Sequence, residues 1–279
     1  MTDRPSVSVY LPTHNRADLL AECISSVLAQ TWSDYELIVV DDGSTDHTPE
    51  VLAESAALDP RVRVIRIATS QGAPHARNVA IEAMRGEYAT GLDDDDLMLP
   101  WRLAQLMKAA SDRWSFICSA FVLEKASGRR RIMNARARSI TLNDILHRNI
   151  AGNQALVRVD RLREIGGFDA ALRSSQDYDL WTRLIERYGP AFRVSGASYR
   201  MRSGYTASNI THSPARAIGA DQYFAKHQPL MNSSHHKSQR LLQYIARDES
   251  ISIRAWPEVM TPKTFDLLAT YTLKKWLQR

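Results

Sequence analysis

The first hundred residues alternate between short apolar runs and longer amphipathic stretches. The runs at 7–11 and 35–40 are nearly continuous and rich in β-branched residues, which is typical of strands buried on both faces of a parallel sheet. Between them, from residue 20 to residue 28, apolar positions recur at helical spacing. These three segments predict a β-α-β unit with a right-handed crossover.

The same alternation continues toward residue 100. It predicts a helix that Asp46 caps and that ends near residue 57, a strand at 62–67, a helix at 74–84 and a strand at 88–92. Strands that alternate with helices indicate an α/β fold with a mostly parallel central sheet flanked by helices.

Beyond Pro100 the alternation is looser. It predicts a strand at 116–123, an arginine-rich hairpin near 129–138, a strand at 154–157 and a helix at about 178–187. After residue 211 we expect helices at about 214–226, 237–247 and 262–277. The chain therefore divides into a domain at 1–212, with halves at 1–100 and 101–212, and a helical C-terminal extension at 213–279.

Polar residues follow three of the predicted strands. In open parallel sheets, ligands bind outside the carboxyl ends of the strands, so these residues should converge on one cleft. The three groups are Thr13, His14, Asn15 and Arg16; Asp41 and Asp42; and Asp93, Asp94, Asp95 and Asp96.

The run of four aspartates at 93–96 points to a cation. Adjacent carboxylates repel one another unless a cation neutralises them, and carboxylate oxygens suit Mg²⁺ or Mn²⁺, which bridge to a diphosphate. The alternative is helix capping, because Asp96 shortly precedes Pro100 and an expected helix start. Capping needs one or two of the four acids, so we predict a divalent cation, Mn²⁺ or Mg²⁺.

Asp41 ends a predicted buried strand. A plain strand-to-turn-to-helix connection explains the residues at 43–46, because Asp, Gly and Ser favour turns. It explains Asp41 less well, since a buried acid is costly unless it accepts hydrogen bonds from a ligand or a neighbour. The imide N–H of a nucleobase would be a suitable donor.

Composition adds limits on the class of protein. A hydrophobic content of 44% allows a real core, and the net charge of +5 favours acidic partners such as nucleotide, phospholipid or anionic glycan. Cys23 and Cys118 fit no metal-ligand or disulfide spacing. Without a leader-like start or roughly 18 consecutive apolar residues, we expect a cytoplasmic protein, with peripheral membrane contact left open and no nucleic-acid partner.

Seven stretches match a known family in order and approximate spacing: VSVYLPTHNR, SVLAQT, ELIVVDDGSTD, GAPHARNVAIEAMRGEY, LDDDDLMLP, GGFD and QDYDLW. Over residues 6–205 the chain resembles the inverting glycosyltransferases of family 2, which have the GT-A fold. The ordered set is highly specific for the family and hardly specific for the sugar. The resemblance implies a nucleotide-sugar donor, with UDP favoured, and a glycan or lipid-linked glycan acceptor in bacterial surface-polysaccharide synthesis.

The resemblance also implies roles for individual residues on the donor side. Thr13, Asn15, Asp41 and Arg77 would line the nucleotide pocket, with Asp41 facing the uracil and Arg77 near the base. Asp93 and Asp95 would form the D-x-D pair, with Asp93 toward the ribose and Asp95 on the metal.

Other candidates near the donor keep two interpretations. Asp94, between the D-x-D pair, ranks lower for nucleotide binding. Arg16 either joins the pocket or is a surface arginine at a helix start. His212 either binds the metal or diphosphate or is an exposed loop histidine, and Arg200 and Arg202 are alternatives for holding the diphosphate.

The second half must supply a base, because displacement at an anomeric carbon requires a carboxylate to take the acceptor proton. In the family this is the aspartate of a Glu-Asp pair at a helix start, which makes Asp177 the candidate and places Gln176 where the family has glutamate. The alternative is that Asp177 stabilises the helix N-terminus, by roughly 0.3–1 kcal/mol. We expect Asp179 to be a structural acid and Trp181 to be core.

Competing functions differ in what should follow the first strand. A dinucleotide oxidoreductase or a sugar nucleotidyltransferase needs a glycine-rich loop there, and LPTHNR contains no glycine. The remaining alternative is a non-catalytic nucleotide-sugar or glycan-binding protein of the same fold, since fold does not establish activity.

Overall fold

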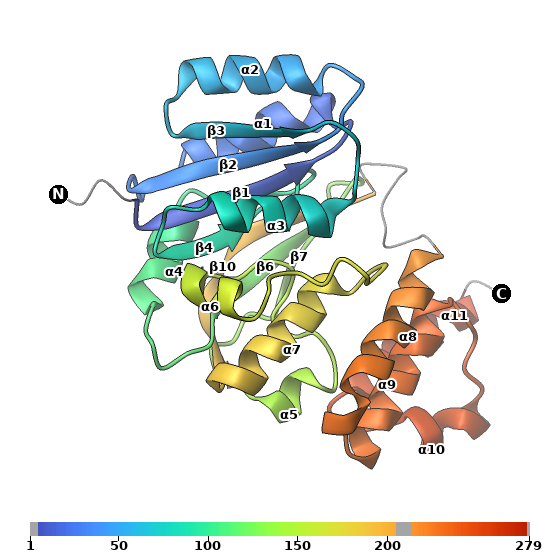
Figure 1. The fold of residues 1–279 in the computed structure, drawn as a ribbon. Helices are drawn as coiled ribbons and strands as arrows, with labels where there is room; N and C mark the ends of the chain where they lie inside the picture. Colours follow the sequence, from blue (N-terminus) through green and yellow to red (C-terminus); the bar gives the residue numbers. More distant parts are fainter. Residues whose placement is uncertain (1–4, 205–213, 278–279) are drawn as a thin grey trace.

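The computed structural model describes residues 5–204 and 214–277. A five-stranded sheet in the order β3-β2-β1-β4-β9 forms the centre of the first half (Figure 1). Its parallel strands are β1 (Val7–Thr13), β2 (Tyr35–Asp42), β3 (Val62–Ile67) and β4 (Tyr88–Gly91). The short β9 (Val157–Arg158) runs antiparallel to β4, so the predicted mostly parallel sheet is confirmed.

Helices cover both faces of this sheet, which explains why its strands read as continuous apolar runs. Side chains alternate along a strand, so Leu37 and Val39 pack on one face with α1 (Ala17–Leu28) and α2 (Thr48–Leu58). Ile38 and Val40 pack on the other face with α3 (Ala73–Ala83).

The expected cap of α2 is wrong. The helix begins at Thr48 with His47 at the cap position, and the Asp46 carboxylate accepts a hydrogen bond from the Thr48 amide at 3.0 Å from the turn before it. Asp46 lies one position before the cap residue. It therefore still accepts a hydrogen bond from an amide of the first turn that has no partner within the helix.

A second sheet is built around the long strand β10 (Ala191–Ser203), in the order β5-β10-β6-β7 with β8 also paired to β10. The predicted strand and arginine-rich hairpin are present as β6 (Ile117–Lys125) and β7 (Arg130–Met133). The shorter members are β5 (Leu97–Met98) and β8 (Arg138–Ile140). The sequence pattern missed β10 because irregular pairing around Gly196, at φ +85°, interrupts its alternation.

The strand expected at 154–157 is mostly irregular. Only Val157 belongs to β9, and Leu156 forms an isolated bridge with Ile117. The preceding residues are held by side-chain contacts at the candidate site instead of by a strand partner.

The remaining helices of this half are α4 (Arg102–Ala109), α5 (Leu142–Ile145), α6 (Val159–Glu164) and α7 (Gln176–Tyr188). Helix α7 starts two residues before the predicted position, directly after Ser175, which has the left-handed φ of 62°. This early start places Asp177 inside the first turn.

Helices α8 (Ala215–His227), α9 (Ser233–Ala246), α10 (Trp256–Val259) and α11 (Phe265–Leu277) form the C-terminal group beside α5 and α7 (Figure 1). They enclose a small core of their own, made of Leu241, Ile251, Val259, Leu268 and Tyr271. The three predicted helices are present, and α10 is an addition. The predicted boundary between 212 and 213 lies outside the described residues and stays a prediction.

Candidate active site

The carboxyl ends of β1, β2 and β4 carry the predicted polar groups. Thr13 pairs with Asp41 in the register of β1 and β2, and the Thr13 hydroxyl donates to Asp94 Oδ2 at 2.9 Å. Arg16 faces the same acid, with its Nε 3.7 Å from Asp94 Oδ1. The structure thus brings together residues from two strand ends, as the pattern predicted.

Asp41 is 1% exposed, and its two carboxylate oxygens have different environments. Oδ1 accepts a hydrogen bond from the Ser44 amide at 2.9 Å. Oδ2 lies 3.6 Å from Nε of the more exposed Arg66 and has no hydrogen-bond donor in the described protein. A buried acceptor without a donor is costly, so Oδ2 is suited to a ligand N–H.

Asn15 has a structural role in the turn after β2. Its Oδ1 accepts the Thr45 amide at 2.8 Å, and its own amide donates to Ser44 Oγ at 2.9 Å. The left-handed φ of 52° lets its short side chain reach back to this turn. Its predicted contact with nucleotide stays a prediction.

The four aspartates have separate environments. Burial raises the pKa of Asp94 to about 6, and burial together with the Asp93 charge raises the pKa of Asp95. Asp96 is 2% exposed and accepts the Arg202 amide at 2.8 Å on β10. Asp96 therefore anchors the second sheet, and the alternative that it caps α4 is wrong.

Asp93 has the richest set of donors. Its Oδ1 accepts from Arg77 Nη2 at 2.9 Å and from Gln154 Nε2 at 3.0 Å, and its Oδ2 lies 3.5 Å from Asn153 Nδ2. Its amide also lies 3.3 Å from the Tyr199 hydroxyl. These contacts fix the carboxylate before any ligand binds.

Arg77 connects the donor side to the first turn of α7. Besides its ion pair with Asp93, its Nη1 lies 3.5 Å from Gln176 Oε1, and its guanidinium lies over the Phe168 ring. Burial opposes its charge, but Asp93, Tyr10 and Asp177 outweigh burial and raise the pKa of Arg77. Its Nε is buried without a hydrogen-bond partner among the described residues.

Asp177 is half-buried in the first turn of α7 and accepts a hydrogen bond from Asn149 Nδ2 at 3.0 Å. Burial raises the pKa of its carboxyl to about 6, although the Arg77 charge opposes the shift. Its position in the first turn also suits the helix dipole. Gln176 is buried beside it and donates to the Leu172 carbonyl at 3.0 Å, so it has a structural role of its own.

Asp179 and Trp181, which also belong to α7, have the structural roles that the sequence predicted. Asp179 is fully buried and pairs with Arg183 at 2.8 Å, Lys226 at 2.8 Å and His227 at 2.9 Å. Trp181 is likewise buried in the main core.

The other residues predicted to hold the metal or the diphosphate are His212, Arg200 and Arg202. His212 lies outside the described residues. Arg200 pairs with Glu124 at 3.4 Å, whereas Arg202 pairs with Glu22 at 2.6 Å and donates from Nε to the Asp95 carbonyl. Arg202 thus holds the backbone of the aspartate run in place through the Asp95 carbonyl.

Within residues 5–204 and 214–277, no three His, Cys, Asp or Glu side chains are arranged to hold a metal ion. Asp94 and Asp95 each offer a carboxylate whose pKa is raised by burial and by neighbouring acids. Mg²⁺ and Mn²⁺ commonly take one or two protein carboxylates and complete their shell with phosphate oxygens and water. The donor set therefore fits such an ion only together with a diphosphate.

Sequence reasoning missed Asn149, Asn153 and Gln154, which contact the two central acids. The only signal was a polar, glycine-containing stretch, NIAGNQ, before an apolar run. Nothing in that pattern gives the direction of a side chain.

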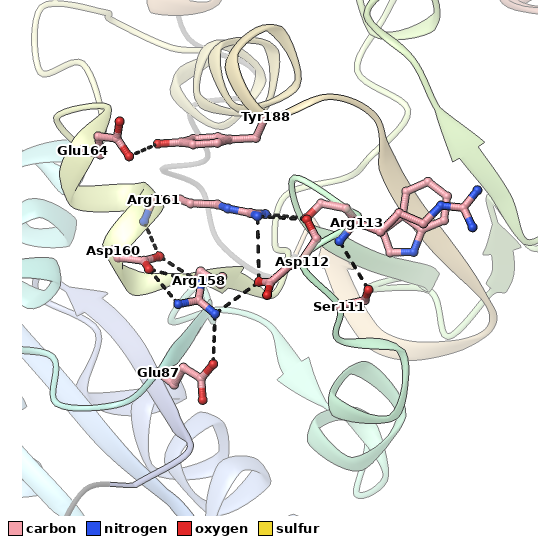
Figure 2. Close-up of polar contacts among 10 residues, drawn as sticks. Glu87, Ser111, Asp112, Arg113, Arg158, Asp160, Arg161, Glu164 and Tyr188 are labelled. Atoms are coloured by element: carbon pink, nitrogen blue, oxygen red, sulfur yellow. Dashed lines mark hydrogen bonds and ion pairs between the residues drawn. The ribbon is translucent and has the colours of Figure 1, made fainter.

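A cavity of about 510 Å³ lies at the opposite end of the sheet, near the start of β4. It borders an ion-pair network in which Arg158 contacts Asp160 at 2.7 Å, Glu87 at 3.1 Å and Asp112 at 3.2 Å (Figure 2). The charges of these side chains are paired with one another. The network joins β4, β9 and α6, far from the aspartate run.

A parallel sheet with polar groups at its strand ends, joined to a second sheet and a helix that presents another acid, is the architecture expected of the GT-A class. The family model for glycosyl transferase family 2 matches residues 8–166, and the chain belongs to this family.

Two relatives carry names from surface-polysaccharide pathways. WcaA of Escherichia coli strain K12, a glycosyl transferase named for colanic acid biosynthesis, is 31% identical over 262 residues, which cover 91% of this chain and 92% of WcaA. TuaG of Bacillus subtilis strain 168, named for teichuronic acid biosynthesis, is 30% identical over 212 residues, which cover 74% of this chain and 83% of TuaG. This chain is a glycosyltransferase, like these relatives.

Solved structures share the fold. The mannosyltransferase PcManGT of Pyrobaculum calidifontis, in complex with GDP-Man and Mn²⁺, has a TM-score of 0.63 at 19% identity and covers 99% of this chain and 81% of its own. Residues 1–349 of S. aureus TarS, in complex with UDP-GlcNAc, have a TM-score of 0.63 at 18% identity over 98% of this chain and 92% of that one.

Proposed function

We propose that this glycosyltransferase moves a sugar from a UDP-sugar to the hydroxyl of a glycan or lipid-linked glycan, with inversion at the anomeric carbon. The names of WcaA and TuaG support a role in bacterial surface-polysaccharide synthesis. The nucleotide-sugars bound to PcManGT and TarS support a donor of this chemical class.

The observation that carries the proposal is the pair of contacts made by Arg77. It binds Asp93 at 2.9 Å and reaches Gln176, the neighbour of Asp177. These contacts support one site that contains an acid at the donor end of the sheet and a carboxylate on α7, as direct transfer between two substrates requires.

Asp177 is the proposed base. A carboxyl with a pKa near 6 is mostly ionised at neutral pH and is a better proton acceptor than an ordinary aspartate. It takes the proton of the acceptor hydroxyl as the oxygen attacks the anomeric carbon, and the nucleoside diphosphate leaves from the opposite face. A single displacement of this kind inverts the configuration.

Asp41 is the proposed acceptor for the nucleobase, through its unsatisfied Oδ2. Arg66 covers that oxygen, and its side chain is 58% exposed, so it can move aside when the base enters. Thr13, Asn15, Arg16, Arg77 and Asp94 line the remainder of the proposed nucleotide pocket, with Asp93 toward the ribose.

Mn²⁺ or Mg²⁺ is the proposed cofactor, held by Asp95 and, outside the described residues, by His212. The ion would neutralise charge on the departing diphosphate. The chain itself keeps Asp95 in place through the bond from Arg202 to its carbonyl.

We also propose a cytoplasmic location with peripheral contact to the membrane. The last turns of α11 support the membrane contact, because Leu273, Trp276 and Leu277 are exposed beside Lys274. Among the described residues, none of the helices has the length and apolar character needed to cross a bilayer.

The test is turnover of a nucleotide-sugar panel with a glycan acceptor in Mn²⁺, with the product configuration read by NMR. We expect inversion, loss of turnover in EDTA, and a fall of about 100-fold or more for Asp177→Asn with nucleotide affinity kept. The matched control, Asp112→Asn in the distant Arg158 network, should keep full turnover. Equal turnover of Asp177→Asn would refute the base.

A further inference from the structure

One short segment, residues 149–154, contacts both acids of the proposed site. At its start, Asn149 Nδ2 donates to Asp177 Oδ2 at 3.0 Å. At its end, Gln154 Nε2 donates to Asp93 Oδ1 at 3.0 Å. Asp177 belongs to α7 and Asp93 follows β4, so a single stretch of backbone connects acids from distant parts of the chain.

The first part of the segment is held in a fixed turn. Asn149 Oδ1 accepts the amides of Ala151 at 3.1 Å and Gly152 at 3.2 Å. The Gly152 carbonyl accepts from the indole of buried Trp181 at 2.9 Å, and the φ of +92° at Gly152 favours glycine. The Asn149 amide group is therefore oriented before any substrate arrives.

The last part is fixed by close packing against the sheet. Gln154 Oε1 accepts from the Tyr10 hydroxyl at 3.2 Å, and the Gln154 carbonyl accepts from buried Arg102 at 3.2 Å. A Cβ at Gly91 would lie 1.9 Å from Gln154 Oε1. Only glycine at 91 lets Gln154 cross β4 and reach Asp93.

We infer that residues 149–154 set the position of the base relative to the donor-side acid, with Asn149 a positioning residue for Asp177 and Gln154 a positioning residue for Asp93. The inference rests on the proposed function. A neutral amide N–H stabilises the ionised carboxylate and selects one orientation of it, which a proton acceptor for a single substrate hydroxyl needs.

Among the residues that the structure describes, charged and titratable groups from three elements act on Asp177. Arg77 comes from α3, Asp93 from the end of β4, and Tyr10 from β1, where burial keeps its phenol neutral by raising its pKa. Asn149 is the neutral donor among them. Replacing it changes the ionisation of Asp177 without removing a neighbouring charge.

The decisive variant is Asn149→Asp, which has nearly the same shape. Its Oδ1 can still accept the Ala151 and Gly152 amides. Its second oxygen replaces the Nδ2 that donates to Asp177 at 3.0 Å and to the Gly152 carbonyl at 3.2 Å, and it brings a like charge to Asp177. We expect kcat to fall about tenfold and the acid limb of the kcat/KM profile, near pH 6 in the parent, to move up by about one pH unit or more. Asn149→Ala should also move the acid limb up, by less than Asn149→Asp does.

The matched control is Asn134→Gly. Asn134 donates to the Ile150 carbonyl of the same segment at 3.2 Å but contacts no acid in the described part of the chain, and glycine tolerates its φ of 57°. Its pH profile should not move. Gln154→Glu, which puts a carboxylate against Asp93, should raise the donor KM more than it lowers kcat.

An unmoved acid limb in both Asn149 variants, with the parent enzyme active, would overturn the inference. Absence of nucleotide-sugar turnover in the parent would instead refute the proposed function. A general structural role would lower kcat or the amount of folded protein without moving the limb, so the pH profile separates the two roles.

Discussion

Gly219 of α8 lies directly against the backbone of Ser174, so close that a Cβ at 219 would come within 2.7 Å of the Ser174 nitrogen. Ser174 and Ser175 lead into the first turn of α7, where Asp177 lies. The same face of α8 also holds this region through Gln222 with the Arg173 amide, Tyr223 stacked on Tyr178, and Lys226 and His227 with Asp179. The C-terminal group is therefore packed against the segment that carries the proposed base.

Gly219→Ala should destabilise the protein, although alanine in a helix interior ordinarily gains up to about 1 kcal/mol over glycine. The added methyl meets backbone atoms that cannot rotate away, so we expect a net loss of about 1–3 kcal/mol. Urea unfolding measures it, with Ala220→Gly showing the effect of helix propensity alone. A gain in stability for Gly219→Ala would contradict the close approach.

Asp41→Ala should weaken binding of the nucleotide by about tenfold or more while the fold persists, because it removes the acceptor proposed for the base. Isothermal titration with UDP measures the change. The neighbouring Asp42 is the contrasting site: its carboxylate accepts the Gln71 and Gly72 amides at 2.9 and 2.8 Å. Asp42→Ala should mainly lower the unfolding free energy, and unchanged UDP affinity in Asp41→Ala would refute the pocket.

Asp179 should make stability depend on acid pH. Despite burial, hydrogen bonding from His227 and the charges of Arg183 and Lys226 lower the pKa of Asp179 to about 2. A carboxyl with a depressed folded-state pKa contributes stability that is present above its unfolded pKa of about 3.9 and is lost as pH falls toward 2. Asp179→Asn should cost about 3–5 kcal/mol at pH 7 and flatten the unfolding free energy between pH 4 and pH 2. A mutant with the parent's acid dependence would contradict this.

Turnover should fall below about pH 6, because the proposed base works only when ionised and burial raises the pKa of Asp177 to about 6. The measurement is kcat/KM from pH 5 to 8 at saturating Mn²⁺. A limb near pH 4, the ordinary range of an exposed aspartate, would contradict the proposed effect of burial on the Asp177 carboxyl.

The sequence by itself determined the β-α-β alternation, the polar groups at three strand ends and the family. These features are local, since apolar periodicity reports burial and the carboxyl ends of parallel strands meet at one edge. The pattern also favoured Asp177 over Asp179, because the family motif names it. There is also a physical reason why Asp177 and Asp179 have different roles. Residues two positions apart on a helix point about 200° apart around its axis, so these two acids face opposite sides of α7.

Only the tertiary structure decided which side chains hold those acids. Asn149, Gln154 and Gly91 are ordinary in sequence, and their roles arise because an irregular segment crosses the end of β4 and reaches α7. Tertiary packing also pairs Asp96, for which helix capping was the alternative interpretation, with the Arg202 amide on β10, a strand whose irregular pairing hides it from periodicity. Contacts between residues far apart in the chain leave no periodic signal, because neither partner's neighbours depend on the pairing.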